Sequence, residues 1–155
     1  MSPGGDSIGH ELASAAEALG VKLPPVEARN ADELEAAFDT IAKMRPDAVL
    51  VSADVLMFQN RARFVRLAAR HMLPATYPIR EFVIDGGLMS YGTNYSEAYR
   101  KVGDYVGRVL NGEKPENLPV QQVTNLQLVN NITTAKTLGL AVPPALVARA
   151  DELIE

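Results

Sequence analysis

At 155 residues the chain is long enough for one domain with a sizeable core but too short for two domains of ordinary size. The formal charge of −4 excludes the basic surface that nucleic-acid binding requires. The lack of cysteine in the sequence excludes thiol catalysis, disulfides and thiolate metal sites, and no apolar run approaches the ~20 residues that cross a bilayer.

The first third of the chain carries signals for two helices. The amino-terminal stretch has neither the basic nor the apolar region of a secretory signal peptide, so the chain as written is expected to stay in the cytoplasm. Apolar residues at helical spacing predict a helix over about 8–19. Residues 21–29 (VKLPPVEAR) predict a short strand weakened by two prolines. Asn30 with Glu33 predicts a capping box for a second helix that ends at Pro46.

Alternating strands and helices follow. The continuous apolar run AVLVS predicts a strand over 48–52 that is buried on both faces, as in parallel sheets. The alternation continues as a helix, a strand, a short helix, a strand and a long helix over 58–71, 74–77, 79–85, 88–92 and 95–110. This order predicts an α/β fold of Rossmann or flavodoxin-like type, a three-layer parallel sheet with helices on both faces and right-handed crossovers. Because such a sheet normally begins with a strand and this chain opens on a helix, the fold is expected to be incomplete.

The last part of the chain departs from this rhythm. Two extended pieces are expected over 120–123 (VQQV) and 126–131 (LQLVNN), separated by only a couple of residues. A short helix is predicted over 133–138. A Pro-Pro pair then opens a final helix over 143–154.

No motif in the sequence indicates covalent chemistry. Around Ser90 the spacing places Leu88 where a nucleophile elbow needs its first glycine, so the glycines there are interpreted as shaping a strand. The sequence has no Gly-x-Gly-x-x-Gly and no Gly-Lys-Ser/Thr phosphate loop. His10 and His71 lie on different predicted helices, and neither has a second histidine at metal spacing. We therefore predict no catalytic residue, no metal ligand and no cofactor, and expect a non-enzyme.

Polar and aromatic residues follow the predicted strands. Asp54 comes just after the AVLVS strand, and it is interpreted either as a ligand contact or as the cap of the following helix. Tyr77 with Arg80, and Ser90 with Tyr91, stand at the ends of the next two strands. Because the carboxyl ends of parallel strands share one edge of a sheet, these side chains predict a rim that binds a small polar organic ligand.

Four stretches together resemble the C-terminal half of an ABC transporter substrate-binding protein of the type I periplasmic binding fold, in a branch that includes tryptophan-binding relatives. They are ARNADELEAAFDTI (28–41), LAARHMLPATYPIREFVIDGGLMSYG (67–92), YVGRVLNGEKPENLPVQQVTNLQLVNN (105–131) and TAKTLGLAVPPALVARADELIE (134–155). They cover nearly the whole chain. Members of this family are about twice as long as this chain, with a signal peptide and two α/β lobes that close on a ligand.

The resemblance implies a division of the chain into three parts. Residues 1–92 would form the core of the C-terminal lobe, and residues 125–155 would return to complete it. Residues 93–124 would hold the hinge crossings and a helix that belongs to the N-terminal lobe. That lobe, and the first strand of the C-terminal lobe, would lie outside this chain. Helix 95–110 would then carry an apolar face whose cover lies outside this chain. That face is made of Ala98, Val102, Tyr105, Val106 and Val109.

By the same resemblance the chain is part of a solute-binding component of an ABC transporter. The full-length family is periplasmic and presents a small organic solute, such as an amino acid, to a membrane permease by closing its lobes. Asp54 and Arg80 would bind polar groups of the solute, while Tyr77 and Tyr91 would add ring surface. Two alternatives stay open: a truncated fragment or a homodimer through the 95–110 face without ligand activity, and a stand-alone flavodoxin-like regulatory domain or enzyme.

Overall fold

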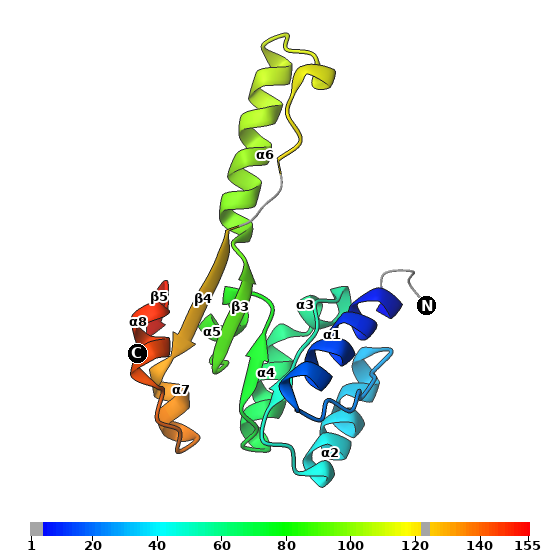
Figure 1. Cartoon of the computed structure of the whole chain (residues 1–155), viewed down its shortest axis with the longest axis vertical. Helices are drawn as coiled ribbons and strands as arrows, with labels where there is room; N and C mark the ends of the chain where they lie inside the picture. Colours follow the sequence, from blue (N-terminus) through cyan, green and yellow to red (C-terminus); the bar gives the residue numbers. More distant parts are fainter. Residues whose placement is uncertain (1–4, 122–124) are drawn as a thin grey trace.

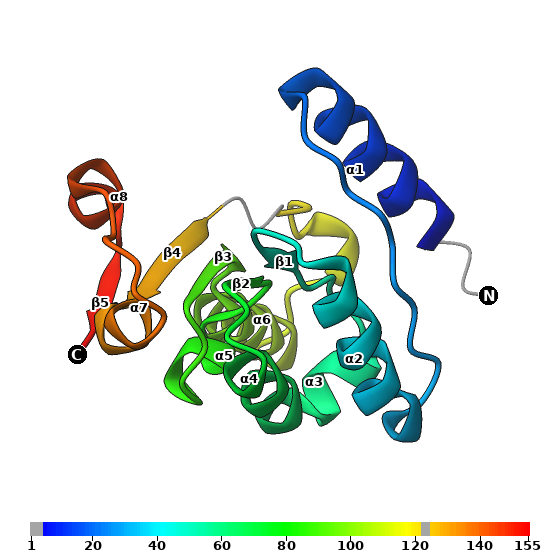
Figure 2. The ribbon, with the colours of Figure 1, turned by 90° about the horizontal axis from the view of Figure 1, so that it is seen from below.

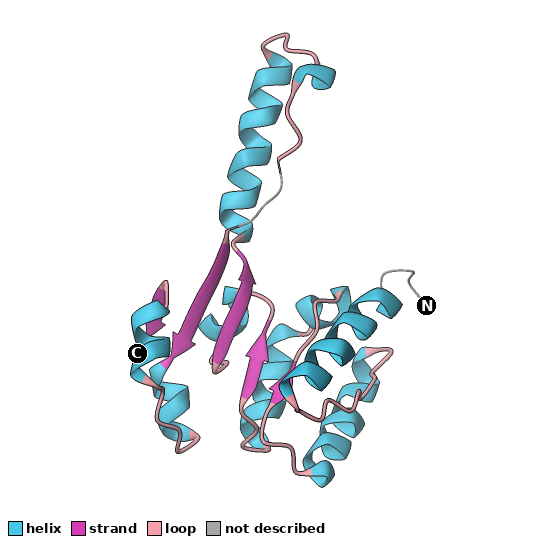
Figure 3. Cartoon of the chain, viewed as in Figure 1, coloured by secondary structure: helices cyan, strands magenta, loops and turns pink. Residues whose placement is uncertain are grey.

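The structure, a computed structural model, describes residues 5–121 and 125–155, which form an α/β fold around a five-stranded sheet (Figures 1 and 3). The strands are β1 (Val49–Leu50), β2 (Ala75–Tyr77), β3 (Met89–Thr93), β4 (Leu126–Asn131) and β5 (Glu152–Ile154). The helices are α1 (Gly5–Leu19), α2 (Leu34–Met44), α3 (Val55–Gln59), α4 (Arg61–Arg70), α5 (Arg80–Ile84), α6 (Tyr95–Leu110), α7 (Ile132–Thr137) and α8 (Pro144–Arg149). Short 3-10 turns, η1 (Ala31–Glu33) and η2 (Pro115–Asn117), precede α2 and follow α6.

The sheet is mostly parallel, in the order β1-β2-β3-β4-β5. β1, β2 and β3 are parallel, β4 and β5 are parallel, and β3 pairs with β4 in antiparallel register through Ser90 and Val129. The all-parallel expectation is therefore wrong at one ladder. The reason is the excursion through α6: the chain leaves the sheet at the end of β3 and returns at the same edge, so β4 must run the opposite way (Figure 1).

The core lies between the sheet and α2, α4 and α5. Phe82 and Val83 of α5 are completely buried, and the α5 helix contacts β2, β3 and β4. The ring of Phe38 in α2 meets the edge of the Phe64 ring in α4, with centroids 5.7 Å apart. Burial of this apolar stripe, rather than helix propensity, holds these short helices in place.

Predictions that depended on local signals are confirmed. The Asn30 half of the capping box is present, since the Asn30 side chain accepts hydrogen bonds from the backbone N–H groups of Asp32 and Glu33. The Glu33 carboxylate accepts from the Arg29 backbone N–H and the Asn30 side-chain amide, whereas a capping box has it accept from the Asn30 backbone N–H. The long helix occupies the predicted 95–110, and Asn94 caps its start. Gly112 closes that helix in the left-handed conformation that glycine tolerates best.

Three predicted elements differ in the structure. Residues 21–29 form no strand, and the predicted helix over 58–71 is two helices, α3 and α4, that meet at Asn60. The final helix ends at Arg149, and the next residues form β5 on the free side of β4. Sheet pairing outweighs helical periodicity there. The predicted extended piece 120–123 overlaps residues outside the described ranges.

The strand predicted over 48–52 exists only as the two-residue β1, at the edge of the sheet. Val51 is buried, as expected for a core strand, but Leu50 is 45% exposed. Burial on both faces is therefore wrong for this strand, because the described residues cover the face of Val51 and leave that of Leu50 open.

Candidate functional site

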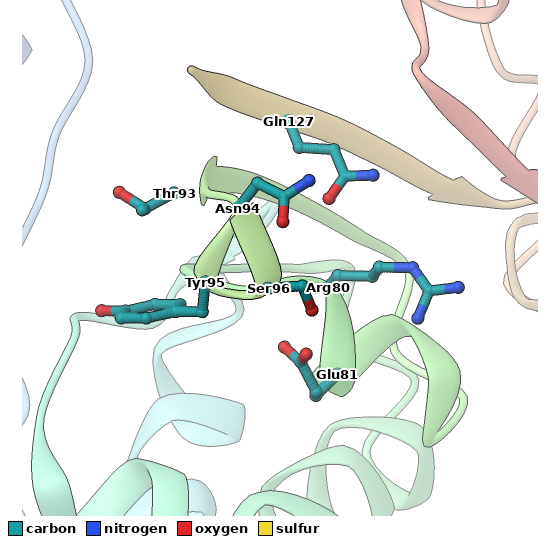
Figure 4. A pocket seen from close by; sticks show the side chains of 7 residues that line it. All are labelled: Arg80, Glu81, Thr93, Asn94, Tyr95, Ser96 and Gln127. Carbon is teal, nitrogen blue, oxygen red and sulfur yellow. The ribbon is translucent and has the colours of Figure 1, made fainter. Parts of the chain in front are cut away.

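A polar hollow of about 160 Å³ lies where β2 and β3 end and β4 begins. Arg80 and Glu81 reach it from the start of α5, just after β2. Gln127 contributes from β4, and the connection from β3 into α6 contributes four consecutive residues, Thr93, Asn94, Tyr95 and Ser96 (Figure 4). In parallel α/β sheets this carboxyl edge is the usual place for ligands.

The arginine of the hollow is held by a carboxylate of the edge strand. Arg80 Nε donates to Glu152 Oε2 at 2.5 Å, and Arg80 Nη2 donates to Glu152 Oε1 at 2.6 Å. This hydrogen bond from Arg80 lowers the pKa of the Glu152 carboxyl and raises the pKa of Arg80. The pair holds the guanidinium beside β5, and among the described residues Nη1 makes no hydrogen bond, so its donors can serve another acceptor.

The connection into α6 is tied to the connection that returns from it. Asn94 Oδ1 accepts from the Glu97 backbone N–H at 3.1 Å, which caps α6. The Glu97 carboxylate accepts from Asn125 Nδ2 at 2.5 Å, and the hydrogen bond lowers the pKa of Glu97, aided by Lys101. The Asn94 backbone N–H donates a hydrogen bond to the Asn125 carbonyl oxygen, with 3.4 Å between the nitrogen and the oxygen. The connection into α6 and the connection that returns from it are therefore held together as one short ribbon between the sheet and α6.

The chemistry of the hollow suits a small ligand with groups of both charges. Arg80 supplies N–H donors for an anion, Glu81 supplies a carboxylate for a cation, and Gln127 supplies an amide. In Figure 4 the Arg80 guanidinium and the Tyr95 phenol point in opposite directions, so polar groups are distributed around the hollow rather than gathered at one point. The volume is below the ~300–1,000 Å³ of typical ligand pockets.

The five residues predicted to form the rim are only partly brought together. Arg80 lines the hollow. Asp54 follows β1 and caps α3, with its Oδ1 accepting from the Leu56 N–H at 2.7 Å, so the capping role that the sequence left open is present. Tyr91 is 58% exposed on β3, and Ser90 is 1% exposed with no hydrogen-bond partner for its Oγ among the described residues. Ligand contacts by Asp54, Ser90 and Tyr91 remain predictions.

Tyr77 belongs to the core in this structure. Its ring stacks on Phe82 with centroids 4.7 Å apart, and burial raises its pKa. The ring lines a second, more apolar hollow of about 110 Å³ beside Gly86, Met72 and Thr137, toward the opposite end of the strands. A ligand contact by Tyr77 at the carboxyl edge also remains a prediction.

Sequence reasoning missed most residues of the polar hollow. Thr93, Asn94 and Ser96 follow a predicted strand, so the rule that ligands collect at strand ends would have included them. Gln127 has no such position in the sequence, because it lies near the start of a strand. It reaches the carboxyl edge of β3 only through the antiparallel pairing of β4 with β3.

Two further properties bear on the class of protein. None of the helices described over 5–121 and 125–155 has the length and apolar character needed to cross a membrane. Within the same ranges, no group of three or more His, Cys, Asp or Glu side chains lies close enough to hold a metal ion.

Solved structures share this fold over almost the whole chain. A conserved domain protein from Vibrio cholerae is 27% identical, with a TM-score of 0.84, over 98% of this chain and 52% of its own length. An ABC domain in complex with L-Trp from Streptococcus pneumoniae is 21% identical, with a TM-score of 0.83, over 96% of this chain and 51% of its own. A ligand-free, open substrate-binding protein with adhesive properties from Clostridium difficile is 19% identical, with a TM-score of 0.66, over 99% of this chain and 51% of its own.

The chain therefore spans about half the length of the solved structures that it matches. No curated protein sequence gives a significant match. The family model described as ABC transporter substrate binding protein matches residues 5–154. Together with the shared α/β fold, this match shows that the chain belongs to the ABC transporter substrate-binding protein family.

Proposed function

We propose that this chain supplies one wall of a solute-binding cleft in an ABC transport system, for a small zwitterionic solute such as an amino acid. The observation that carries the proposal is the polar hollow at the carboxyl edge, which both Arg80 and Glu81 line. A zwitterion needs both groups. Membership of the family and the L-Trp bound to the streptococcal relative support the solute class.

The opposite wall comes from a second lobe in this proposal. A hollow of about 160 Å³ encloses too little of a ligand for tight binding, and the matched structures are about twice as long as the region they share with this chain. Residues 1–92 and 125–155 are the C-terminal lobe, and 93–124 hold the hinge and a helix of the other lobe. The hydrogen-bonded ribbon at Asn94, Glu97 and Asn125 is the hinge about which the lobes close.

The exposed face of α6 supports a covering lobe. Tyr95, Tyr99, Val102, Val106 and Val109 repeat at intervals of four and three, the spacing by which one helix packs against another, and they are 39–72% exposed. By the same periodicity the charged residues of α6 fall on the opposite side. Figure 1 shows α6 extending away from the sheet, with only the returning segment beside it. The cover that we propose is the N-terminal lobe.

The proposal places the assembled protein outside the cytoplasmic membrane, where it delivers its solute to an ABC permease. It is a binding role, in which no bond of the solute is made or broken. A homodimer through α6, or a fragment without ligand activity, is the second candidate, and the exposed apolar face of α6 is the observation that favours it.

Titration of the isotopically labelled chain with L-tryptophan, L-leucine and L-glutamate tests the proposal. Because one wall alone binds weakly, we expect millimolar dissociation constants and fast exchange, about −4 kcal/mol of binding free energy. Chemical-shift changes should concentrate at Arg80, Ser96 and Gln127. Met72 and Thr137, in the apolar hollow, serve as the internal control. The proposal fails if no amino acid shifts the first group, or if the control residues shift more.

A further inference from the structure

The charges around the polar hollow do not balance. Arg80 and Glu81 line it, and the Arg80 guanidinium is already paired with the carboxylate of Glu152 in β5. Both carboxylates raise the pKa of Arg80, Glu152 mainly through its hydrogen bonds and Glu81 through its charge. One guanidinium is therefore set against two carboxylates, and one negative formal charge is left over. A positive group that enters the hollow is favoured over a negative one.

The guanidinium of Arg80 has little left to offer an anion. Its Nε and Nη2 donors both bond the Glu152 carboxylate, at 2.5 Å and 2.6 Å, and this is the fork geometry that the carboxylate of a solute would otherwise use. The Nη1 donors remain, but an anion there would approach a guanidinium whose charge Glu152 already neutralises. The nearby Glu81 carboxylate would repel the same anion.

The Glu81 carboxylate is in the opposite situation. Among residues 5–121 and 125–155 it forms no ion pair. Figure 4 shows this carboxylate pointing toward Ser96, whereas the Arg80 guanidinium extends away from it. An ammonium group has three donors, so one such group can bond Glu81 and a neighbouring hydroxyl together.

The other groups of the hollow do not reverse this preference. The Ser96 hydroxyl and the Gln127 amide both donate and accept, so they serve a ligand of either charge. The amino-terminal end of α6 favours an anion, but Asn94 Oδ1 already accepts from the Glu97 N–H, and the Glu97 carboxylate stands in the first turn. The preference is therefore set by the one guanidinium and the two carboxylates.

We infer that the polar hollow selects the cationic end of its solute, with Glu81 as the partner of an ammonium group and Glu152 as a positioning residue that withholds Arg80 from anions. The inference rests on the proposed function, because it takes the hollow to be the solute site. It goes further by naming the solute class. An organic amine binds this wall without the need for a carboxylate.

Two indole compounds with side chains of matched length separate the two charges. Tryptamine carries the ammonium group alone, and indole-3-propionate carries the carboxylate alone. Each is titrated at low salt into the isotopically labelled chain, and the dissociation constant is taken from the chemical shifts of Ser96 and Gln127. We expect tryptamine to bind about fivefold more tightly than indole-3-propionate, the ratio for an ion pair that solvent reaches.

Three variants assign the preference to residues. Glu81→Gln should weaken tryptamine until the two compounds bind within about twofold of each other. Glu152→Gln releases the guanidinium, so indole-3-propionate should bind about threefold more tightly than it binds the parent chain. Glu116→Gln removes the same unit of charge from a residue that does not line the hollow, and it should change neither constant. The amide spectrum of each variant reports that it is folded.

Different results overturn the inference and the proposed function. Equal or tighter binding of indole-3-propionate by the parent chain, with shifts at Ser96 and Gln127, would overturn the inference and leave the proposed function standing. A preference for tryptamine that survives Glu81→Gln would do the same, as would one lost equally in Glu116→Gln, because it would then reflect the net charge of −4. Unchanged binding of indole-3-propionate by Glu152→Gln would overturn the role of Glu152. If neither compound nor L-tryptophan shifts Ser96 or Gln127, the proposed function itself fails.

Discussion

At the scale of single residues, Gly92 sets the distance between β3 and the chain that leaves β2. A β-carbon placed on Gly92 would lie 1.9 Å from the carbonyl oxygen of Pro78. The contact is with backbone, so no rotation of a side chain can relieve it. Arg80 lies two residues after Pro78, and its position in the polar hollow depends on this close approach.

Substitution Gly92→Ala should therefore lower the free energy of unfolding by about 2–3 kcal/mol, because β3 or the segment after β2 must move. Urea unfolding followed by circular dichroism measures it. Gly103→Ala is the matched control. Gly103 lies in the middle of α6 with no atom near its missing β-carbon, so alanine should be neutral or stabilise by up to ~1 kcal/mol. Equal effects of the two substitutions would contradict the close approach at Gly92.

The ion pair between Arg80 and Glu152 predicts a pH dependence. Hydrogen bonding to Arg80 lowers the folded-state pKa of Glu152, so its stabilisation is present above the unfolded-state pKa of about 4.3 and is lost as the pH falls through the lower folded value. Both side chains are partly exposed, which limits the effect to about 1 kcal/mol.

Comparison of Glu152→Gln with the parent chain checks this sign. The difference in unfolding free energy should be constant from pH 8 to about pH 5 and should shrink below about pH 4. Glu116→Gln, in a largely exposed pair with Lys114, should show no difference at any pH. A difference for Glu152→Gln that persists unchanged at pH 3 would show that the carboxylate charge is not its origin.

At the scale of elements, the valines of α6 and of α5 differ in how far they are buried. Val102 and Val106 are 57% and 52% exposed, whereas Val83 of α5 is fully buried. Replacing either α6 valine with glutamine should change the unfolding free energy by no more than ±0.5 kcal/mol, since no cover is lost and helix propensity does not fall. Val83→Ala should cost about 2 kcal/mol.

Thermal and urea unfolding of these three variants measures whether α6 is uncovered in the chain alone. A loss above 1 kcal/mol for Val102→Gln would mean that the apolar face is already packed in solution, as it would be in a homodimer. That outcome would favour the second candidate function over the covering lobe.

The elements also show where sequence reasoning succeeds. The limits of α6 and the cap at Asn30 were predictable because helical periodicity and capping depend on residues a few positions apart. The segments 21–29, 48–52 and 150–154 were not, because strand formation depends on a partner distant in sequence. Among the candidate site residues, Arg80 could be predicted, because it lies in the turn that follows the predicted strand 74–77. Gln127 required the register between β3 and β4.

At the scale of the whole molecule, the chain combines a five-stranded sheet and its helices with two surfaces that the other described residues leave uncovered. The apolar face of α6 lies beyond one end of the sheet, and the open edge of β1 lies at its side (Figure 1). The polar hollow is lined by residues of the ribbon that leads to α6, of α5 and of β4. A second lobe that packs on α6 would therefore face the hollow and close it, which is how one wall becomes a cleft.

The most direct test of this account locates the solute on the wall. The chain has no cysteine, so a nitroxide label can be attached at one chosen site, Leu126→Cys near the polar hollow or Met72→Cys beside the apolar one. The relaxation of L-tryptophan protons is then measured with each labelled protein. The account predicts stronger relaxation with the label at position 126, abolished by reduction of the nitroxide. Equal or stronger relaxation with the label at position 72 would contradict it.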